Sequence, residues 1–162
     1  MITFGSFTGS VMGISKVERG DVPDGCVQMV HLQNEEGTLA NFIVSPDTYV
    51  LNQEMITMGD IVTGYYDASA PMILIYPPQY PALVMVKQCP DFKVKVSHFN
   101  KDLVSDDNRL SLNMNPYTRV MTTNGQMFMG HPGGHDLVVV YSPSTKSIPA
   151  QTTPYQVVVL CQ

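Results

Sequence analysis

Residues 59–66 read GDIVTGYY, and residues 77–86 read PPQYPALVMV. Both segments are short and rich in Val, Ile and Tyr, and Gly or Pro interrupts them. This composition is typical of β-strands bounded by turns. Both segments have counterparts further along the chain, GHDLVVVYS at 134–142 and TTPYQVVVLC at 152–161. The pair therefore predicts an all-β unit that occurs twice.

A third block supports the repeat. SPDTYV at 45–50 recurs as NPYTRV at 115–120, so three blocks follow one another in the same order in each half. Self-similarity of this kind indicates repeated structural units. We expect a first unit over residues 1–88 and a second, diverged unit over residues 89–162.

Strand signals run through the whole chain, and long helical periodicity is absent. One short helical turn is expected at residues 52–58. Five strands left open would expose unpaired backbone at the sheet edges, so each unit is expected to close into a small barrel. The expected strands are residues 3–17, 26–33, 39–45, 60–66, 82–88, 92–99, 109–114, 136–141 and 156–161.

This order of blocks resembles the OB-fold. More narrowly, GDIVTGYYDASAP at 59–71 followed by YPPQYPALV at 76–84 is similar to a group of uncharacterised bacterial OB-like proteins, some of which carry the unit beside cell-surface domains. The resemblance covers residues 1–88 well and 92–162 loosely, since the second unit lacks the Tyr-Tyr-Asp and Tyr-Pro-Pro signature. It implies two tandem, closely packed, five-stranded OB-like barrels. It implies no particular activity, because OB barrels bind oligonucleotides, sugars or proteins.

The charge is weakly acidic and unevenly distributed. The net charge is −5, and residues 1–86 hold nine acidic and two basic residues while residues 87–162 hold seven basic and five acidic ones. An acidic chain is a poor partner for nucleic-acid phosphates. The three cysteines are far apart, as expected for thiols in a reducing compartment. Without a visible signal peptide, a cytoplasmic location is expected, although a chain trimmed of its leader would look the same.

Comparing the halves separates residues expected to serve the fold from candidate ligand residues. Tyr65 and Tyr80 recur as Tyr141 and Tyr155, so packing is their expected role. Adjacent tyrosines in a strand point to opposite faces, so one of Tyr65 and Tyr66 is expected to be exposed. Loop rigidity is the alternative role for the residues that do not recur. The candidate binding surface for a protein, peptide or glycan consists of Tyr66, Asp67, Tyr76 and Pro77.

A second candidate surface lies in FKVKVSHFNK at residues 92–101. Lys93, Lys95 and Phe99 fall on one face of the expected strand, and basic side chains interleaved with aromatic rings suit single-stranded nucleic acid. Binding of nucleic acid through the second unit is therefore the alternative function. The same pattern also fits a plain amphipathic strand with a solvated outer face.

A third candidate is the segment MFMGH. Met127, Met129 and His131 alternate there, and thioether and imidazole ligands suit Cu(I). Alternating methionines equally fit an apolar strand face packed into a core. The sequence holds no phosphate-binding glycine loop, nucleophile elbow or dinucleotide fingerprint. We therefore expect a non-catalytic binding or assembly module with no cofactor and no membrane partner. The sequence does not predict whether the chain forms oligomers.

Overall fold

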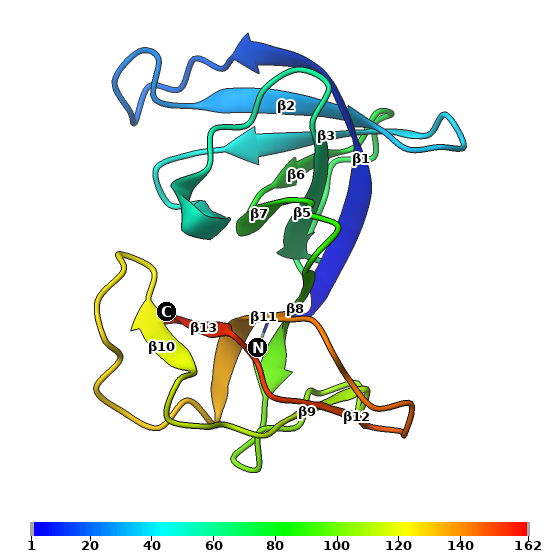
Figure 1. Ribbon diagram of the computed structural model, residues 1–162. Helices are drawn as coiled ribbons and strands as arrows, with labels where there is room; N and C mark the ends of the chain where they lie inside the picture. The colour runs from blue at the N-terminus through cyan, green and yellow to red at the C-terminus, as the bar shows by residue number, and fades with distance from the viewer. Residues whose placement is uncertain (1, 162) are drawn as a thin grey trace. The chain divides into compact units, whose positions relative to one another are not determined.

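The computed structural model describes residues 2–161, and within them it is all-β, as the sequence predicts. It contains thirteen strands and one short 3-10 turn over these residues (Figure 1). No helix in this described part of the chain has the length and apolar character needed to cross a membrane. The chain divides into two compact units, residues 1–88 and 89–162.

Unit 1 is built around one long, bent strand. The strand β1 is 13 residues long, and its register shifts at a bulge between Val11 and Gly13. A bulge bends a strand and increases its twist, so one strand can follow two directions. The elements of unit 1 are β1 (Phe4–Lys16), β2 (Gln28–Gln33), β3 (Leu39–Val44), β4 (Tyr49–Val50), η1 (Leu51–Gln53), β5 (Ile61–Asp67), β6 (Gln79–Pro81) and β7 (Val84–Lys87).

The seven strands of unit 1 form one sheet in the order β4-β7-β5-β1-β2-β3-β6. The first half of β1 pairs antiparallel with β5, and the second half pairs antiparallel with β2. β2 then pairs antiparallel with β3, β3 pairs parallel with β6, and β5 pairs antiparallel with β7. β6 lies at one end of this order and β7 near the other, although the two strands follow each other directly along the chain. β4 adds a short parallel contact to β7.

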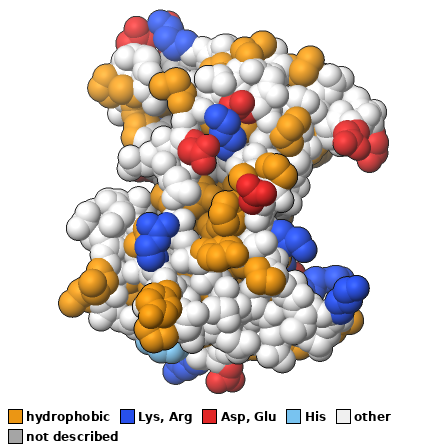
Figure 2. Space-filling view, viewed as in Figure 1, with side chains coloured by type: hydrophobic (Ala, Val, Ile, Leu, Met, Phe, Trp, Pro, Cys, Tyr) orange, Lys and Arg blue, Asp and Glu red, His pale blue; other side chains and the backbone are white. Residues whose placement is uncertain are grey.

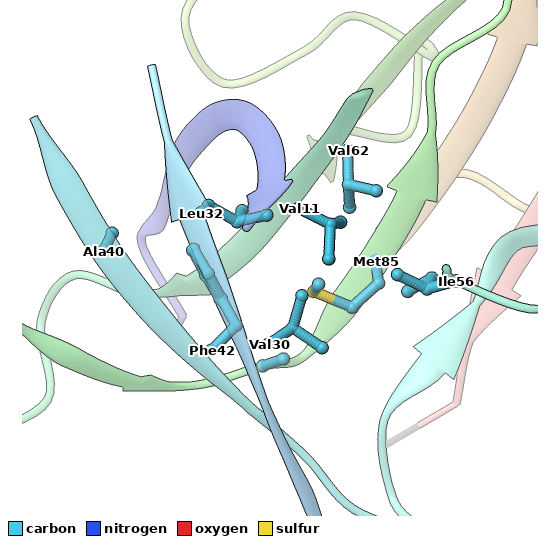
Figure 3. Packing of buried hydrophobic residues seen from close by; sticks show 9 residues of the cluster. Val11, Val30, Leu32, Ala40, Phe42, Ile56, Val62 and Met85 are labelled. Atoms are coloured by element: carbon cyan, nitrogen blue, oxygen red, sulfur yellow. The ribbon is translucent and has the colours of Figure 1, made fainter. Parts of the chain in front are cut away.

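The core of unit 1 consists of residues from several strands of this sheet. Alternate residues of each strand point inward, and the inward ones are apolar. Phe42 and Leu32 are fully buried there, and Met85 fills the space between strands (Figure 3). The cluster consists of Val11, Val30, Leu32, Ala40, Phe42, Ile56, Val62, Ala82 and Met85.

Unit 2 has a four-stranded sheet and a two-stranded one. The four strands lie in the order β10-β13-β11-β8, and β9 pairs parallel with β12. Single bridges from Phe99 to Ser105 and from Val104 to Ser111 link the two sheets. A second core lies here, around Phe99, Leu137 and Val157. The strands are β8 (Lys93–Phe99), β9 (Leu110–Leu112), β10 (Arg119–Thr122), β11 (His135–Tyr141), β12 (Ala150–Thr152) and β13 (Gln156–Leu160).

The two units contain the same kinds of pairing in the same chain order. The antiparallel pairs β1–β5 and β5–β7 correspond to β8–β11 and β11–β13. The parallel pairs β3–β6 and β4–β7 correspond to β9–β12 and β10–β13. A threonine hydroxyl lies at the same place in each: Thr48 Oγ1 donates to the Ala82 carbonyl at 2.8 Å, and Thr118 Oγ1 donates to the Pro154 carbonyl at 2.9 Å.

Some local expectations from the sequence are wrong. Helical geometry at residues 52–58 is absent, and a 3-10 turn covers only Leu51–Gln53. Asn52 and Gln53 have φ values of 56° and 55°, in the left-handed region, which a regular right-handed helix does not allow. The strands β4, β6, β10 and β12 were not among those expected. They are two to four residues long, too short for an alternating pattern to appear.

Candidate functional site

An exposed apolar loop lies between β5 and β6. Residues 72–76, Met-Ile-Leu-Ile-Tyr, belong to no strand, and all five side chains are exposed. Leu74 is 98% exposed and Ile73 is 78% exposed. Ordinary surfaces carry single exposed apolar residues and rarely a continuous run. The sequence analysis selected only Tyr76 from this run, although Pro71 and Pro77 on either side of it are a signal against a buried strand.

Asp67 holds the turn that leads into this 72–76 loop. Its Oδ1 accepts hydrogen bonds from Ser69 Oγ at 2.6 Å, the Ser69 amide at 3.0 Å and the Thr3 amide at 3.3 Å. The Ser69 hydroxyl bond, followed by the Ser69 amide, holds the pKa of the Asp67 carboxyl below its usual value. These bonds give the predicted binding residue Asp67 a structural role at the entry of the loop.

Tyr76 and Pro77 hold the other end of the loop. The Tyr76 hydroxyl accepts a hydrogen bond from the Leu39 amide at 3.0 Å, while the ring remains exposed. The peptide bond between Tyr76 and Pro77 is cis. Leu39 begins β3 immediately after the hairpin turn that carries Glu35 and Glu36, both exposed. The loop is therefore fixed at both ends, and an acidic hairpin borders it.

Tyr66 is part of the packing of unit 1, contrary to the ligand platform predicted for it. Its ring stacks on Tyr80 with centroids 3.8 Å apart and lies 6.1 Å from Phe42. It also covers Gly5, where a Cβ atom would lie 2.6 Å from the Tyr66 ring. Tyr65 is buried and Tyr66 is partly buried, so neither ring is exposed in the way that the sequence predicts for one of them. Burial, reinforced by a hydrogen bond with Tyr66, raises the pKa of Tyr80.

The structure separates the three residues of the nucleic-acid surface. Phe99 is fully buried in the core of unit 2, so its ring cannot stack on a base. Lys95 forms an ion pair with Asp107. Lys93 is exposed at the start of β8. On the face in view in Figure 2, the Lys and Arg side chains are dispersed and form no continuous strip.

The methionines of the predicted metal site point outward. Met127 and Met129 are exposed, and Phe128 between them packs against the core of unit 2, so the expected core-facing methionine stripe is wrong. His131 Nδ1 accepts a hydrogen bond from the Gly133 amide at 3.0 Å. In the neutral ring the proton is then on Nε2, which leaves neither nitrogen free for a metal. Within residues 2–161, no three His, Cys, Asp or Glu side chains are placed to hold a metal ion.

A hydrogen-bonded row on unit 1 was missed by sequence reasoning. Ser15 Oγ lies 3.0 Å from His31 Nε2, and His31 Nδ1 lies 2.8 Å from Asn41 Oδ1. The three residues come from β1, β2 and β3, and 16 and 10 positions separate them along the chain. Only the strand register brings them together, so no local motif in the sequence reveals the row.

Comparison of the chain with protein-family models, curated proteins and solved structures found no match.

Proposed function

We propose that each unit is an OB-like barrel and that the two arose by duplication. The pairing of unit 1 supports this, because the third strand of the β1–β2–β3 meander pairs parallel with β6, which leads directly into the last strand, β7. A five-stranded Greek-key barrel has this pattern when β6 and β7 count as one closing strand. The corresponding pairings in unit 2 support the duplication, as do the threonines that immediately precede β4 and β10. In unit 2, single bridges take the place of the second strand.

We further propose that the chain is a binding module and that the 72–76 loop is its docking element. The observation that carries this proposal is a run of five exposed apolar side chains held at both ends by hydrogen bonds. Burying a side chain such as Ile or Leu contributes about 1.5–3 kcal/mol. Because the ends are fixed, a partner loses less of this energy to ordering the loop.

The charge around the loop favours one class of partner, a protein segment that combines apolar residues with Lys or Arg. Glu35 and Glu36 lie in the hairpin that the Tyr76 hydroxyl contacts through Leu39. Residues 1–86 as a whole hold nine acidic and two basic side chains. Such a surface attracts basic segments and repels phosphates and acidic segments. Tyr66 and Tyr80, two rings that a glycan could otherwise stack on, stack on each other.

Selection of displayed random peptides on the immobilised full-length chain tests this function. We expect the enriched peptides to carry Lys or Arg among apolar residues. The double variant Ile73→Ser/Leu74→Ser should weaken their binding at least tenfold, which corresponds to about 1.4 kcal/mol. Glu35→Gln/Glu36→Gln should weaken it less and should reduce its dependence on salt.

The matched control is Met127→Ser/Met129→Ser, which removes two exposed methionines from unit 2. Binding that survives the loop variant, or that only this control abolishes, contradicts the proposal. A library with no enriched sequence also contradicts it. Sedimentation that reveals a dimer lost in Ile73→Ser/Leu74→Ser would give the loop a second copy of the chain as its partner and overturn the basic-peptide assignment.

A further inference from the structure

A serine, a histidine and an asparagine form a row across the outer face of unit 1. In β2, Val30 and Leu32 point into the core, so His31 between them points outward. His31 lies opposite Asn41 of β3 in the register. Ser15 of β1 lies opposite Met29, one outward position away from His31, which makes it the diagonal neighbour of the imidazole.

The hydrogen bonds fix the tautomer of the histidine. Asn41 Oδ1 is a carbonyl oxygen and only accepts, so His31 Nδ1 donates across the 2.8 Å contact. The neutral imidazole then has a free electron pair on Nε2, and Ser15 Oγ–H donates to it across 3.0 Å. A serine nucleophile is activated when its hydroxyl donates to one nitrogen of a neutral imidazole while a third group holds the other nitrogen of that ring. Ser15, His31 and Asn41 have this arrangement.

The surroundings leave the serine accessible and supply an apolar neighbour. Ser15 is exposed and His31 is half-buried, while Asn41 is buried. Met29, opposite Ser15, and Ile43, opposite Met29, form a partly exposed apolar row beside the polar one. An acyl or aryl group that reaches Ser15 can pack against the apolar side chains of Met29 and Ile43.

We propose that Ser15 is a nucleophile that accepts acyl groups from activated esters, with His31 as its base and Asn41 as a positioning residue. Ser15 Oγ forms a bond to the acyl carbon while its proton passes to His31 Nε2. The ester C–O bond breaks, and the alcohol or phenol leaves with the electron pair and takes that proton. A water molecule, deprotonated by His31, then hydrolyses the acyl-serine and releases the carboxylic acid. Aryl esters suit this site best, because a phenoxide leaves with little assistance.

The test is acetylation of the full chain by p-nitrophenyl acetate, followed by nitrophenolate release and by peptide mapping. We expect an acetyl ester on Ser15 that Ser15→Ala abolishes. His31→Gln should slow its formation about 100-fold, the lower range for loss of a general base. Neutral hydroxylamine removes the ester on Ser15 but leaves any amide on the adjacent Lys16, so the two are distinguished. Ser6→Ala, an exposed serine of the same strand, serves as the control and should not change the rate.

Asn41 is tested by two variants, because the buried side chain also affects stability. Asn41→Ala should slow acetylation of Ser15, and Asn41→Asp should raise the rate above wild type, since a carboxylate stabilises the imidazolium better than an amide. Urea midpoints establish that each variant is folded. An ester on Ser15 that forms equally fast in His31→Gln, or acetylation confined to lysines, overturns the proposal. A folded Asn41→Asp that is no faster than Asn41→Ala overturns the role of Asn41.

Discussion

At the scale of single residues, packing explains more of this chain than its conspicuous motifs do. Tyr66 belongs to the most unusual part of the sequence, yet its ring stacks on Tyr80 and covers Gly5. An aromatic ring over a strand glycine replaces the contacts that the missing side chain would have made. Tyr66 of β5 therefore packs against Gly5 of the neighbouring strand, β1.

This pairing gives a prediction for Gly5→Ala. The new Cβ would lie 2.6 Å from the Tyr66 ring, so the ring must move off Tyr80. Overpacking of this kind costs about 1–3 kcal/mol, and the gain from replacing a strand glycine is about 0.5–1 kcal/mol. We expect a net loss of about 1 kcal/mol of unfolding free energy in urea. Gly20→Ala, with nothing within 4 Å of the new Cβ, is the control, and equal stability of the two variants contradicts this account.

Asp67 gives a prediction for pH dependence. Its folded-state pKa is lowered, mainly by the Ser69 hydroxyl and amide, so the ionised carboxylate favours the folded chain. This stabilisation is complete above the ordinary aspartate pKa of about 3.9 and is lost as pH falls through the lower folded value. The gap in urea midpoint between wild type and Asp67→Asn should be constant near neutrality and shrink below about pH 4. A gap that persists unchanged to pH 3 would exclude this role for the carboxylate.

At the scale of elements, short parallel strands hold each unit together where the sequence offers little signal. Strand β10 pairs with β13, and the Thr118 hydroxyl beside it donates to Pro154 and accepts from the Asn115 amide at 3.4 Å. In unit 1, Thr48 makes the same two kinds of bond, to Ala82 and from Ser45. One hydroxyl therefore fixes the start of each short strand.

Thr118→Val and Thr48→Val keep the side-chain shape and remove these bonds. Each should lower the unfolding free energy by about 1 kcal/mol, the usual net value of a hydrogen bond in a folded protein. Thr153→Val, at an exposed threonine, is the control. The measurement is the urea midpoint of each variant. Values equal to the control would show that the threonine bond does not hold the strand.

The sequence predicts long elements well and short ones poorly, for physical reasons. β1, β5, β8 and β11 have seven or more residues, so their alternation or their apolar runs are visible in the sequence. β4 and β12 have two and three residues, and their pairing depends on partners 30 or more positions away. At residues 52–58, the left-handed backbone of Asn52 replaced the expected helix.

Prediction of the candidate site residues is limited in the same way, because it depends on contacts between distant parts of the chain. The lack of a repeat partner made Tyr76 a candidate binding residue, and its ring is exposed. The same criterion failed for Tyr66, because its stacking partner is 14 positions away and Phe42 comes from another strand. Phe99 shared a predicted face with two lysines, yet it is buried. The contact between Ser15 and His31 depends on the register of β1 against β2 after the bulge beside Gly13. A glycine within a strand indicates a bend or bulge, but it does not predict the register that follows.

At the scale of the whole molecule, the chain combines two stable cores with one exposed apolar loop. The cores around Phe42 and Phe99 each draw on residues of a single unit. The 72–76 loop contributes no residue to the core of unit 1, and hydrogen bonds from Asp67 and Tyr76 hold it in place. Its apolar side chains are thus available for a partner without any change in the sheet that carries the loop.

Amide hydrogen exchange of the full chain, alone and with a selected peptide at saturation, tests the central claim that this loop is the docking element. In the free chain, residues 72–75 should exchange fast, because they lie outside the strand ladders, while β2, β3 and β5 should exchange slowly. The peptide should slow exchange over residues 72–76 and over the adjoining hairpin at 34–39, and nowhere else. Slow exchange of residues 72–75 in the free chain, or protection that appears only in unit 2, would contradict the account.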